Sequence, residues 1–172
     1  MLMGQGKIVY MHNPSKVKWK NSAWFLVAVI VILLDQLSKA WALKHLAWAE
    51  PMQVMPLLNF HLAFNTCAAY SFLHHASGWQ NIFFVTLAVL VSAWLIYSLL
   101  TDARAKACVL HAGFAFILGG ALSNAWDRIQ YKAVIDFINP HIGDWYFAIF
   151  NIADSAITLG AICLIWFWWR EK

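Results

Sequence analysis

Four apolar runs, each close to the length of a bilayer core, constrain this chain more than any other feature. They cover residues 23–43, 82–100, 107–126 and 152–169. A membrane-spanning helix needs about 20 mainly apolar residues, and its backbone polar groups must be bonded within the segment. The short alternating segments of a membrane barrel are absent. Because 62% of residues are hydrophobic and only 12% charged, the sequence predicts an all-α membrane protein with four transmembrane helices, forming one domain over residues 1–172.

The basic residues predict how these helices lie in the membrane. The segments before the first run, between the second and third, and after the fourth contain Lys7, Lys16, Lys18, Lys20, Arg104, Lys106, Arg170 and Lys172. The opposite side has fewer basic residues, namely Lys44, Arg128 and Lys132. The positive-inside rule therefore places both termini in the cytoplasm and the other two loops outside. This asymmetry accounts for the net charge of +4, so we predict no nucleic-acid partner.

Two segments outside the apolar runs are predicted to rest on the outer face. Residues 50–78 contain two prolines and then alternate apolar and polar positions, which is typical of short strands. We call this segment the β-cradle. Residues 136–150 contain a turn signal at Pro140 and Gly143, followed by the aromatic run Trp145 to Phe147. Such aromatics prefer the headgroup layer, and they are predicted either to anchor this segment there or to close over a site as a lid.

Two aspartates, Asp136 and Asp154, lie where apolar sequence meets polar sequence. A carboxylate at membrane depth is costly unless it is paired, hydrated or functional. Asp154 also suits the start of the fourth helix, where an acid caps free N–H groups. Asp136, within V-I-D-F-I, has no such structural role. Two carboxyls with different proton affinities are what an aspartic protease dyad uses, one as general base toward water and one as general acid toward the scissile carbonyl.

The outer end of the third run reads G-G-A-L-S-N-A-W-D-R. If the helix continues, Asn124 shares a face with Asp127 and Arg128, at spacings of three and four. These side chains either bind the backbone of an extended peptide or satisfy free carbonyls at a helix end, with Gly119 and Gly120 permitting close helix packing. The local sequence favours neither interpretation.

The first run contains D-Q-L-S-K, in which Asp35 and Lys39 lie four residues apart on one helix face. We interpret them as a structural ion pair near the outer boundary, with Lys39 extending to the interface, because pairing is how buried charges are tolerated. The three cysteines stand singly and H-E-x-x-H is absent, so no disulfide or metal site is predicted. No cofactor is expected either, because two aspartates supply both proton acceptor and donor.

Five motifs in order carry a family resemblance. D-Q-L-S-K, F-N-T-C-A-A-Y-S-F-L, G-G-A-L-S-N-A-W-D-R-I, V-I-D-F-I and F-N-I-A-D-S-A-I follow one another along nearly the whole chain. In this respect the chain resembles the lipoprotein signal peptidases, or signal peptidase II, the membrane aspartic proteases of bacteria. The resemblance implies a location in the cytoplasmic (inner) membrane, with the site near the outer face, a small extracytoplasmic β-cradle and an amphipathic segment over the site. It implies cleavage of diacylglyceryl-modified prolipoproteins just before the lipidated cysteine.

The same resemblance implies roles for individual residues. Asp136 and Asp154 would form the catalytic dyad. The residues that would line the substrate groove are Asn65, Asn124, Arg128 and Asn151. Those with supporting roles are Asp127, which would orient Arg128, and the structural pair Asp35 and Lys39. The implied partners are prolipoprotein substrates, membrane lipids and cyclic peptide inhibitors of the globomycin type, and a monomer would suffice.

Two residues depart from the family pattern. Cys67 and Ser123 stand where the family usually has glycine, so a side chain at either position is expected to narrow the groove or shift a loop. Other classes stay open. A catalytically impaired, lipoprotein-binding relative would keep the fold without the dyad. A proton-coupled carrier would place its acids near the midplane. A serine protease that uses Ser123 and His111 is compatible with the spacing but has no support from their surroundings.

Overall fold

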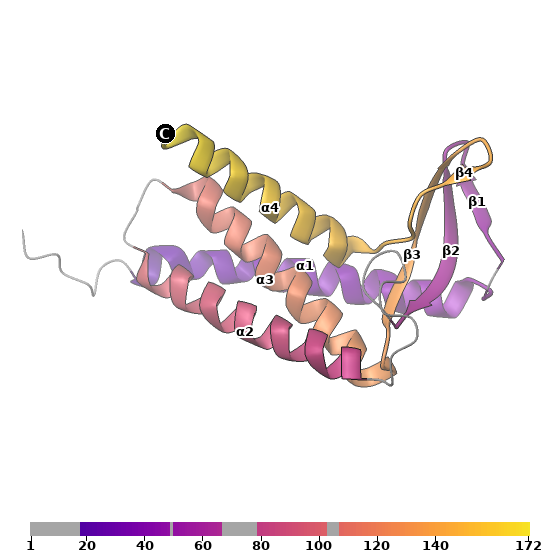
Figure 1. The fold of residues 1–172 in the computed structure, drawn as a ribbon, viewed down its shortest axis with the longest axis horizontal. Helices are drawn as coiled ribbons and strands as arrows, with labels where there is room; N and C mark the ends of the chain where they lie inside the picture. Colours follow the sequence, from indigo (N-terminus) through magenta and orange to yellow (C-terminus); the bar gives the residue numbers. More distant parts are fainter. Residues whose placement is uncertain (1–17, 49, 67–78, 103–106) are drawn as a thin grey trace, which may run out of the picture.

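The computed structural model describes residues 18–48, 50–66, 79–102 and 107–172 (Figure 1). Its four long helices are α1 (Lys18–His45), α2 (Trp79–Thr101), α3 (Cys108–Tyr131) and α4 (Ile152–Arg170). Each is long and apolar enough to cross a membrane. The predictions that lie outside the described residues concern Cys67, the second half of the β-cradle, and the basic residues Lys7, Lys16, Arg104 and Lys106.

The helices form one bundle, with the strands gathered at one of its ends and the C-terminus at the other (Figure 1). Large apolar side chains such as Leu37, Ile82 and Trp169 are about two-thirds exposed or more, at 67%, 71% and 71%. This outward apolar surface suits contact with lipid, because lipid chains are as apolar as the side chains themselves. The prediction of four membrane helices with a small sheet is confirmed.

Helix α3 lies at the centre of the bundle and contacts α1, α2 and α4. Two adjacent glycines make this possible. A Cβ on Gly119 would lie 2.7 Å from the carbonyl oxygen of Ala28 in α1, and one on Gly120 would lie 2.5 Å from the carbonyl oxygen of Ala153 in α4. Since real Cβ atoms do not approach so closely, both positions need glycine for the helices to touch. The expected close packing at these two glycines is confirmed.

A four-stranded antiparallel sheet covers the end of the bundle, in the order β1 (Met52–Met55), β2 (Leu58–Asn65), β3 (Val134–Ile142) and β4 (Trp145–Tyr146). Strand β2 pairs with β3, which joins two segments that lie far apart in the sequence. A buried cluster ties the sheet to the C-terminal end of α1 and consists of Ala42, Leu46, Leu62, Ile135 and Phe137. The sheet therefore has its own small core against α1.

Residues 136–150, predicted either to anchor in the headgroup layer or to close over a site as a lid, lie mainly in the sheet. Residues 136–142 belong to β3, and a turn at Gly143, whose φ is +58°, leads back through β4. The chain then returns to α4 beside β3, since Phe150 exchanges backbone hydrogen bonds with Ile138. Residues 136–150 therefore do not form a segment separate from the sheet, because they contribute most of β3 and all of β4.

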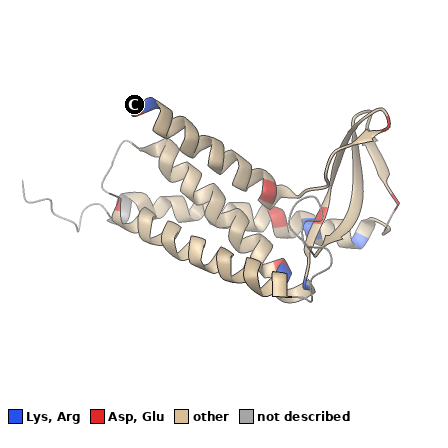
Figure 2. Cartoon of the chain, in the orientation of Figure 1, with Lys and Arg blue, Asp and Glu red and all other residues tan. Residues whose placement is uncertain are grey.

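Charged residues are nearly absent from the middle of the bundle and gather at its ends, most densely where it meets the sheet (Figure 2). The far end is mostly apolar, and its buried cluster includes Leu95, Leu99, Leu110, Phe114 and Leu118. The end next to the sheet is therefore where buried polar chemistry concentrates.

Candidate active site

Asp136 and Asp154 reach the junction of bundle and sheet from different elements. Asp136 lies in β3 and is buried, with 2% of its surface exposed. Asp154 is half-buried in the first turn of α4, where it forms a capping box with Asn151. In this box the Asn151 side chain accepts a hydrogen bond from the backbone N–H of Asp154 at 2.8 Å, and the Asp154 carboxylate accepts one from the backbone N–H of Asn151 at 3.3 Å. The helix start thus fixes one of the two acids.

Asn151 also joins the two acids to each other. Its Nδ2 donates to Asp136 Oδ1 at 2.7 Å. Because its Oδ1 already accepts from the backbone N–H of Asp154, its amide can turn only one way, with the NH₂ group toward Asp136. One fully buried asparagine therefore spans both carboxyls.

Asn65, the last residue of β2, contacts Asp136 from the other side. Its Nδ2 donates to Asp136 Oδ2 at 3.0 Å, and the pairing of β2 with β3 sets this approach. Burial, followed by the nearby negative charge of Asp154, raises the pKa of Asp136 from its ordinary 3.8 to about 7. The hydrogen bonds from Asn65 and Asn151 act in the opposite direction. Asp136 is thus able to hold a proton near neutral pH.

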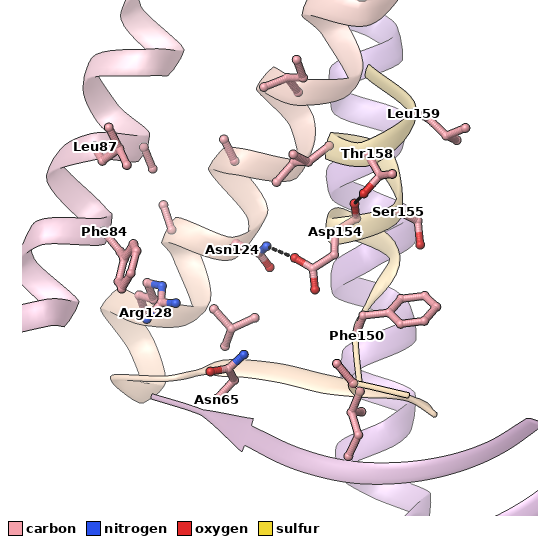
Figure 3. Close-up of a pocket in the computed structure, with 18 of the residues that line it drawn as sticks. Asn65, Phe84, Leu87, Asn124, Arg128, Phe150, Asp154, Ser155, Thr158 and Leu159 are labelled. Atoms are coloured by element: carbon pink, nitrogen blue, oxygen red, sulfur yellow. Dashed lines mark hydrogen bonds between the residues drawn. The ribbon is translucent and has the colours of Figure 1, made fainter. Parts of the chain in front are cut away.

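Asp154 receives a third contact from α3. Asn124 Nδ2 donates to Asp154 Oδ1 at 2.8 Å, as Figure 3 shows. The other end of the Asn124 amide accepts a hydrogen bond from Lys39 Nζ at 3.0 Å. An ammonium group can only donate, so Lys39 sets the direction in which Asn124 points and thereby presents its NH₂ group to Asp154.

Lys39 sits in a buried ion cluster with Asp35 and Asp127. Its Nζ lies 2.6 Å from Asp35 Oδ2 and 2.6 Å from Asp127 Oδ2, and all three side chains are at most 1% exposed. The predicted pairing of Asp35 with Lys39 is seen, but the expectation that Lys39 extends to the interface is wrong. A second carboxylate from α3 and the Asn124 amide compensate the buried charge, so Lys39 points into the bundle.

The two acids of this cluster also hold neighbouring elements. Asp35 Oδ1 accepts a hydrogen bond from the backbone N–H of Ala153 at 2.8 Å, which satisfies a free donor in the first turn of α4. Asp127 Oδ2 accepts one from the backbone N–H of Ile135 in β3 at 3.3 Å. Asp127 is therefore a supporting residue that joins α3 to α1 and β3, while its expected role in orienting Arg128 stays a prediction.

Sequence reasoning missed the contribution of Gln36 and misjudged that of Ser123. Ser123 is fully buried between α1 and α3, and its Oγ donates to Asp35 Oδ2 at 2.7 Å. Gln36 Nε2 donates to Ser123 Oγ at 2.9 Å and to Asp127 Oδ1 at 2.8 Å. Ser123 does not narrow the groove, because its hydroxyl points into the ion cluster and it is outside the cavity lining, while the alternative that it shifts a loop stays a prediction. Gln36 could have been identified from the sequence, because it is a polar residue next to Asp35 within an apolar run.

A cavity of about 1240 Å³ opens beside Asp154, between α2, α3 and α4. Its polar lining comes from Asn65, Asn124, Arg128, Asp154, Ser155 and Thr158. Figure 3 shows Asn65, Asn124 and Asp154 near one another at the sheet end of this cavity, with Phe150 beside them. The remaining walls are apolar, including Leu87 and Val91 of α2. The arrangement fits an apolar ligand with a polar segment placed against Asp154.

The structure also tests the alternative of a serine protease that uses Ser123 and His111. Ser123 and His111 lie twelve residues apart on α3, or about 18 Å along a helix, and His111 pairs with Asp102 at 3.0 Å. A serine–histidine pair is thereby excluded. Within the described part of the chain, no group of three or more His, Cys, Asp or Glu side chains is placed to hold a metal ion.

Comparisons with known proteins agree on one family. The family model described as "Signal peptidase (SPase) II" matches residues 27–170. A lipoprotein signal peptidase of Coxiella burnetii (strain RSA 493 / Nine Mile phase I) is 47% identical over 153 residues, covering 89% of this chain and 91% of that protein. One from Acinetobacter baumannii (strain AB307-0294) is 48% identical over 145 residues, covering 84% of this chain and 82% of that protein. A solved structure described as a bacterial membrane enzyme superposes with a TM-score of 0.78 at 30% identity, covering 87% of this chain and 89% of that one.

Proposed function

This chain belongs to the signal peptidase II family and removes signal peptides from lipoproteins, and we propose that it does so as an aspartic endopeptidase whose catalytic dyad is Asp136 and Asp154. The bridge that Asn151 makes between the two carboxyls carries this proposal. It ties the buried Asp136 to Asp154, which lines one large cavity. Paired carboxyls of this kind hydrolyse peptides without a cofactor.

The surroundings of the two acids support different roles. Asp154 lines the cavity and accepts hydrogen bonds from Asn124 and Asn151, as a carboxylate does. It would act as general base and take a proton from the attacking water. Asp136, with a pKa of about 7, would hold the proton that moves to the oxygen of the scissile carbonyl. The resulting tetrahedral intermediate breaks down when the amide nitrogen receives a proton from Asp154 and Asp136 regains its own.

Asp136 must exchange one partner when substrate binds. In the free enzyme its Oδ2 accepts a hydrogen bond from Asn65 and its Oδ1 one from Asn151. Asn151 is fixed by the cap of α4, whereas Asn65 stands at the end of β2 and lines the cavity. We infer that the substrate carbonyl takes the place of Asn65 at Oδ2 and that Asn65 then binds the substrate backbone.

The cavity indicates how the substrate is held. A signal peptide is itself an apolar helix, and the walls formed by α2 and α4 can receive it from the side while its acyl chains stay in lipid. Cleavage just before the lipidated cysteine would follow from placing that unwound segment against Asp154. Asn65, Asn124 and Arg128 line the cavity and would bind its backbone, while Asn151 would contact it through the dyad. Cyclic peptide inhibitors of the globomycin type would compete for the same groove.

The proposed orientation puts the dyad near the outer face of the bacterial membrane. The C-terminus, with Arg170 and Lys172 nearby, lies at the end of the bundle away from the sheet (Figure 1). By the positive-inside rule this end is cytoplasmic, and the dyad at the opposite end faces outward. All the residues of the proposed site come from one chain, so a monomer would be sufficient.

The test is cleavage of a diacylglyceryl-modified prolipoprotein by purified protein in detergent. We expect the parent to cut before the modified cysteine, and Asp136→Asn and Asp154→Asn each to lose activity by about 10²–10⁴-fold or more. Asp144→Asn, an exposed acid in the β3–β4 turn, is the matched control and should keep full activity. A well-folded parent that binds this substrate without cleaving it would overturn the proposal in favour of a binding role.

A further inference from the structure

Helix α2 holds Arg128 through two side chains that lie one turn apart. The guanidinium carbon of Arg128 lies 4.5 Å from the centre of the Phe84 ring, over its face. Asn81 Nδ2 donates to the backbone carbonyl oxygen of Arg128 at 3.0 Å. Residues three apart share a helix face, so one stripe of α2 contacts both the charge and the backbone of the same residue. We call Asn81 and Phe84 the α2 clamp.

The backbone contact is needed because Arg128 lies in the last turn of α3, which ends at Tyr131. The last four carbonyl groups of a helix have no partner within it. Asn81 satisfies one of them and thereby fixes the end of α3 against the start of α2. With the backbone fixed, the direction of the Arg128 side chain depends on what its guanidinium contacts.

The ring contact suits a cation that must bind a substrate. Arg128 is 8% exposed and lines an otherwise mainly apolar cavity together with Phe84 (Figure 3). The attraction between a guanidinium and an aromatic face strengthens as water is excluded. A ring has no lone pairs, so unlike a carboxylate it does not take the N–H donors away from a peptide carbonyl. Phe84 can therefore contact the cation through its ring face without accepting any of its N–H donors.

We propose that Phe84 is a positioning residue for this enzyme: it aims the Arg128 guanidinium at the backbone of the substrate, and Asn81 anchors the helix end from which Arg128 extends. The inference rests on the proposed function, in which Arg128 binds substrate. It assigns to α2, which contributes neither acid of the dyad, a part in substrate affinity. Loss of the ring therefore weakens binding more than it slows the chemical step.

The first experiment compares Phe84→Leu with Tyr97→Leu in detergent, with diacylglyceryl-modified prolipoprotein as substrate. Because the Phe83 ring packs edge-on against Phe84, with ring centroids 5.3 Å apart, the matched control is Tyr97→Leu, at an aromatic residue of the same helix that is 67% exposed and outside the cavity lining. We expect Phe84→Leu to raise the apparent KM by about three- to thirtyfold with kcat within about twofold, Tyr97→Leu to leave both unchanged, and Phe84→Tyr to keep the parent KM. Equal effects of the two leucine variants, or a loss confined to kcat, would overturn the proposal.

A second pair of measurements separates positioning from direct packing on the substrate. In an Arg128→Ala background, Phe84→Leu should change KM by less than about twofold, because the group that Phe84 positions is gone. Replacing Phe84 with increasingly fluorinated phenylalanines weakens the ring's attraction for a cation without removing the ring, and KM should rise step by step. A flat series, or an undiminished effect in Arg128→Ala, contradicts the proposal. The dyad variants test the proposed function separately, so either can fail alone.

Discussion

The two ends of the helix bundle are held together by different chemistry. At the end next to the sheet, α1 and α3 are joined by Lys39 and two carboxylates, all almost fully buried. At the other end the helices meet through an apolar cluster and the pair of His111 with Asp102. Buried charges are expensive to assemble and seldom add stability over apolar packing. We therefore expect the buried charges at the end next to the sheet to serve a function. The hydrogen bonds that extend from them lead to Asp154.

That chain of contacts has few steps. Lys39 donates to Asn124, and Asn124 donates to Asp154. On the other side, Asp35 caps the first turn of α4 beside Asp154. The ion cluster thus sets the position of Asp154, a member of the proposed dyad that it does not touch, whereas the described residues of the apolar end have no connection to that dyad. Five predictions test this difference, from the largest expected effect to the smallest.

Replacing Lys39 with methionine should have the largest effect. The two carboxylates that flank Lys39 would be left buried without their cation, which costs about 3–5 kcal/mol in the free energy of unfolding. Asn124 would also lose the donor that fixes its direction, so activity should fall even in protein that remains folded. Thermal unfolding in detergent and the cleavage rate per folded molecule measure the two effects. A stable, fully active variant would show that the cluster is unconnected to the site.

The second largest effect is expected in the way the free energy of unfolding depends on pH. Because the pKa of Asp136 is raised from 3.8 to about 7, the folded protein binds more protons than the unfolded chain between these values. Stability should therefore fall as pH rises through that window, by up to about 4 kcal/mol in total. Asp136→Asn should remove this slope, whereas Asp144→Asn should keep it. Identical slopes in parent and Asp136→Asn would contradict the assignment.

Asp136 should also determine how kcat/KM depends on pH. If Asp136 donates a proton to the scissile carbonyl, kcat/KM should fall as pH rises above about 7. The apparent pKa measured in this way belongs to the coupled pair with Asp154. A rate that keeps rising up to pH 9 would show that a protonated Asp136 is not required.

A smaller effect is expected at Ser123. Its hydroxyl donates to Asp35, and loss of a hydrogen bond to a charged group costs about 1.5–3 kcal/mol. Ser123→Ala should therefore lower stability by about that amount while leaving the apparent KM within about twofold, since Ser123 lies outside the cavity lining. A change in substrate or inhibitor affinity without a loss of stability would restore the expectation that this side chain shapes the groove.

The smallest effect should come from the apolar end. Asp102, the partner of His111, has an 11% exposed side chain and so keeps some access to water. His111→Leu should therefore cost about 1 kcal/mol and leave the cleavage rate of folded protein unchanged. Parallel unfolding curves for this variant and Lys39→Met supply the direct comparison of the two ends. A loss of activity in folded His111→Leu protein would show that contacts at the apolar end also affect the proposed dyad.

The sequence predicted local features well and partners from distant segments poorly. Run length and composition predicted the four helices, and the spacing of four predicted the pairing of Asp35 with Lys39. The third member of that cluster, Asp127, comes from α3, and no local pattern brings it to Lys39. The same holds for Phe84, one of twelve phenylalanines, whose contact with Arg128 exists only once α2 packs on α3. The family resemblance supplied expected roles for individual residues, which the spacing of residues alone does not predict.

The capping box of α4 has a consequence for biosynthesis. Domains generally fold in the order in which they are synthesised, and α4 follows the other three helices in the chain. Asp154 and Asn151, which complete and bridge the proposed dyad, occupy the start of α4. A nascent chain that has inserted only its first three helices would therefore hold one buried acid and no hydrolytic pair. Proteolytic competence would arise only on insertion of α4, so incomplete chains in the membrane would be unable to cut.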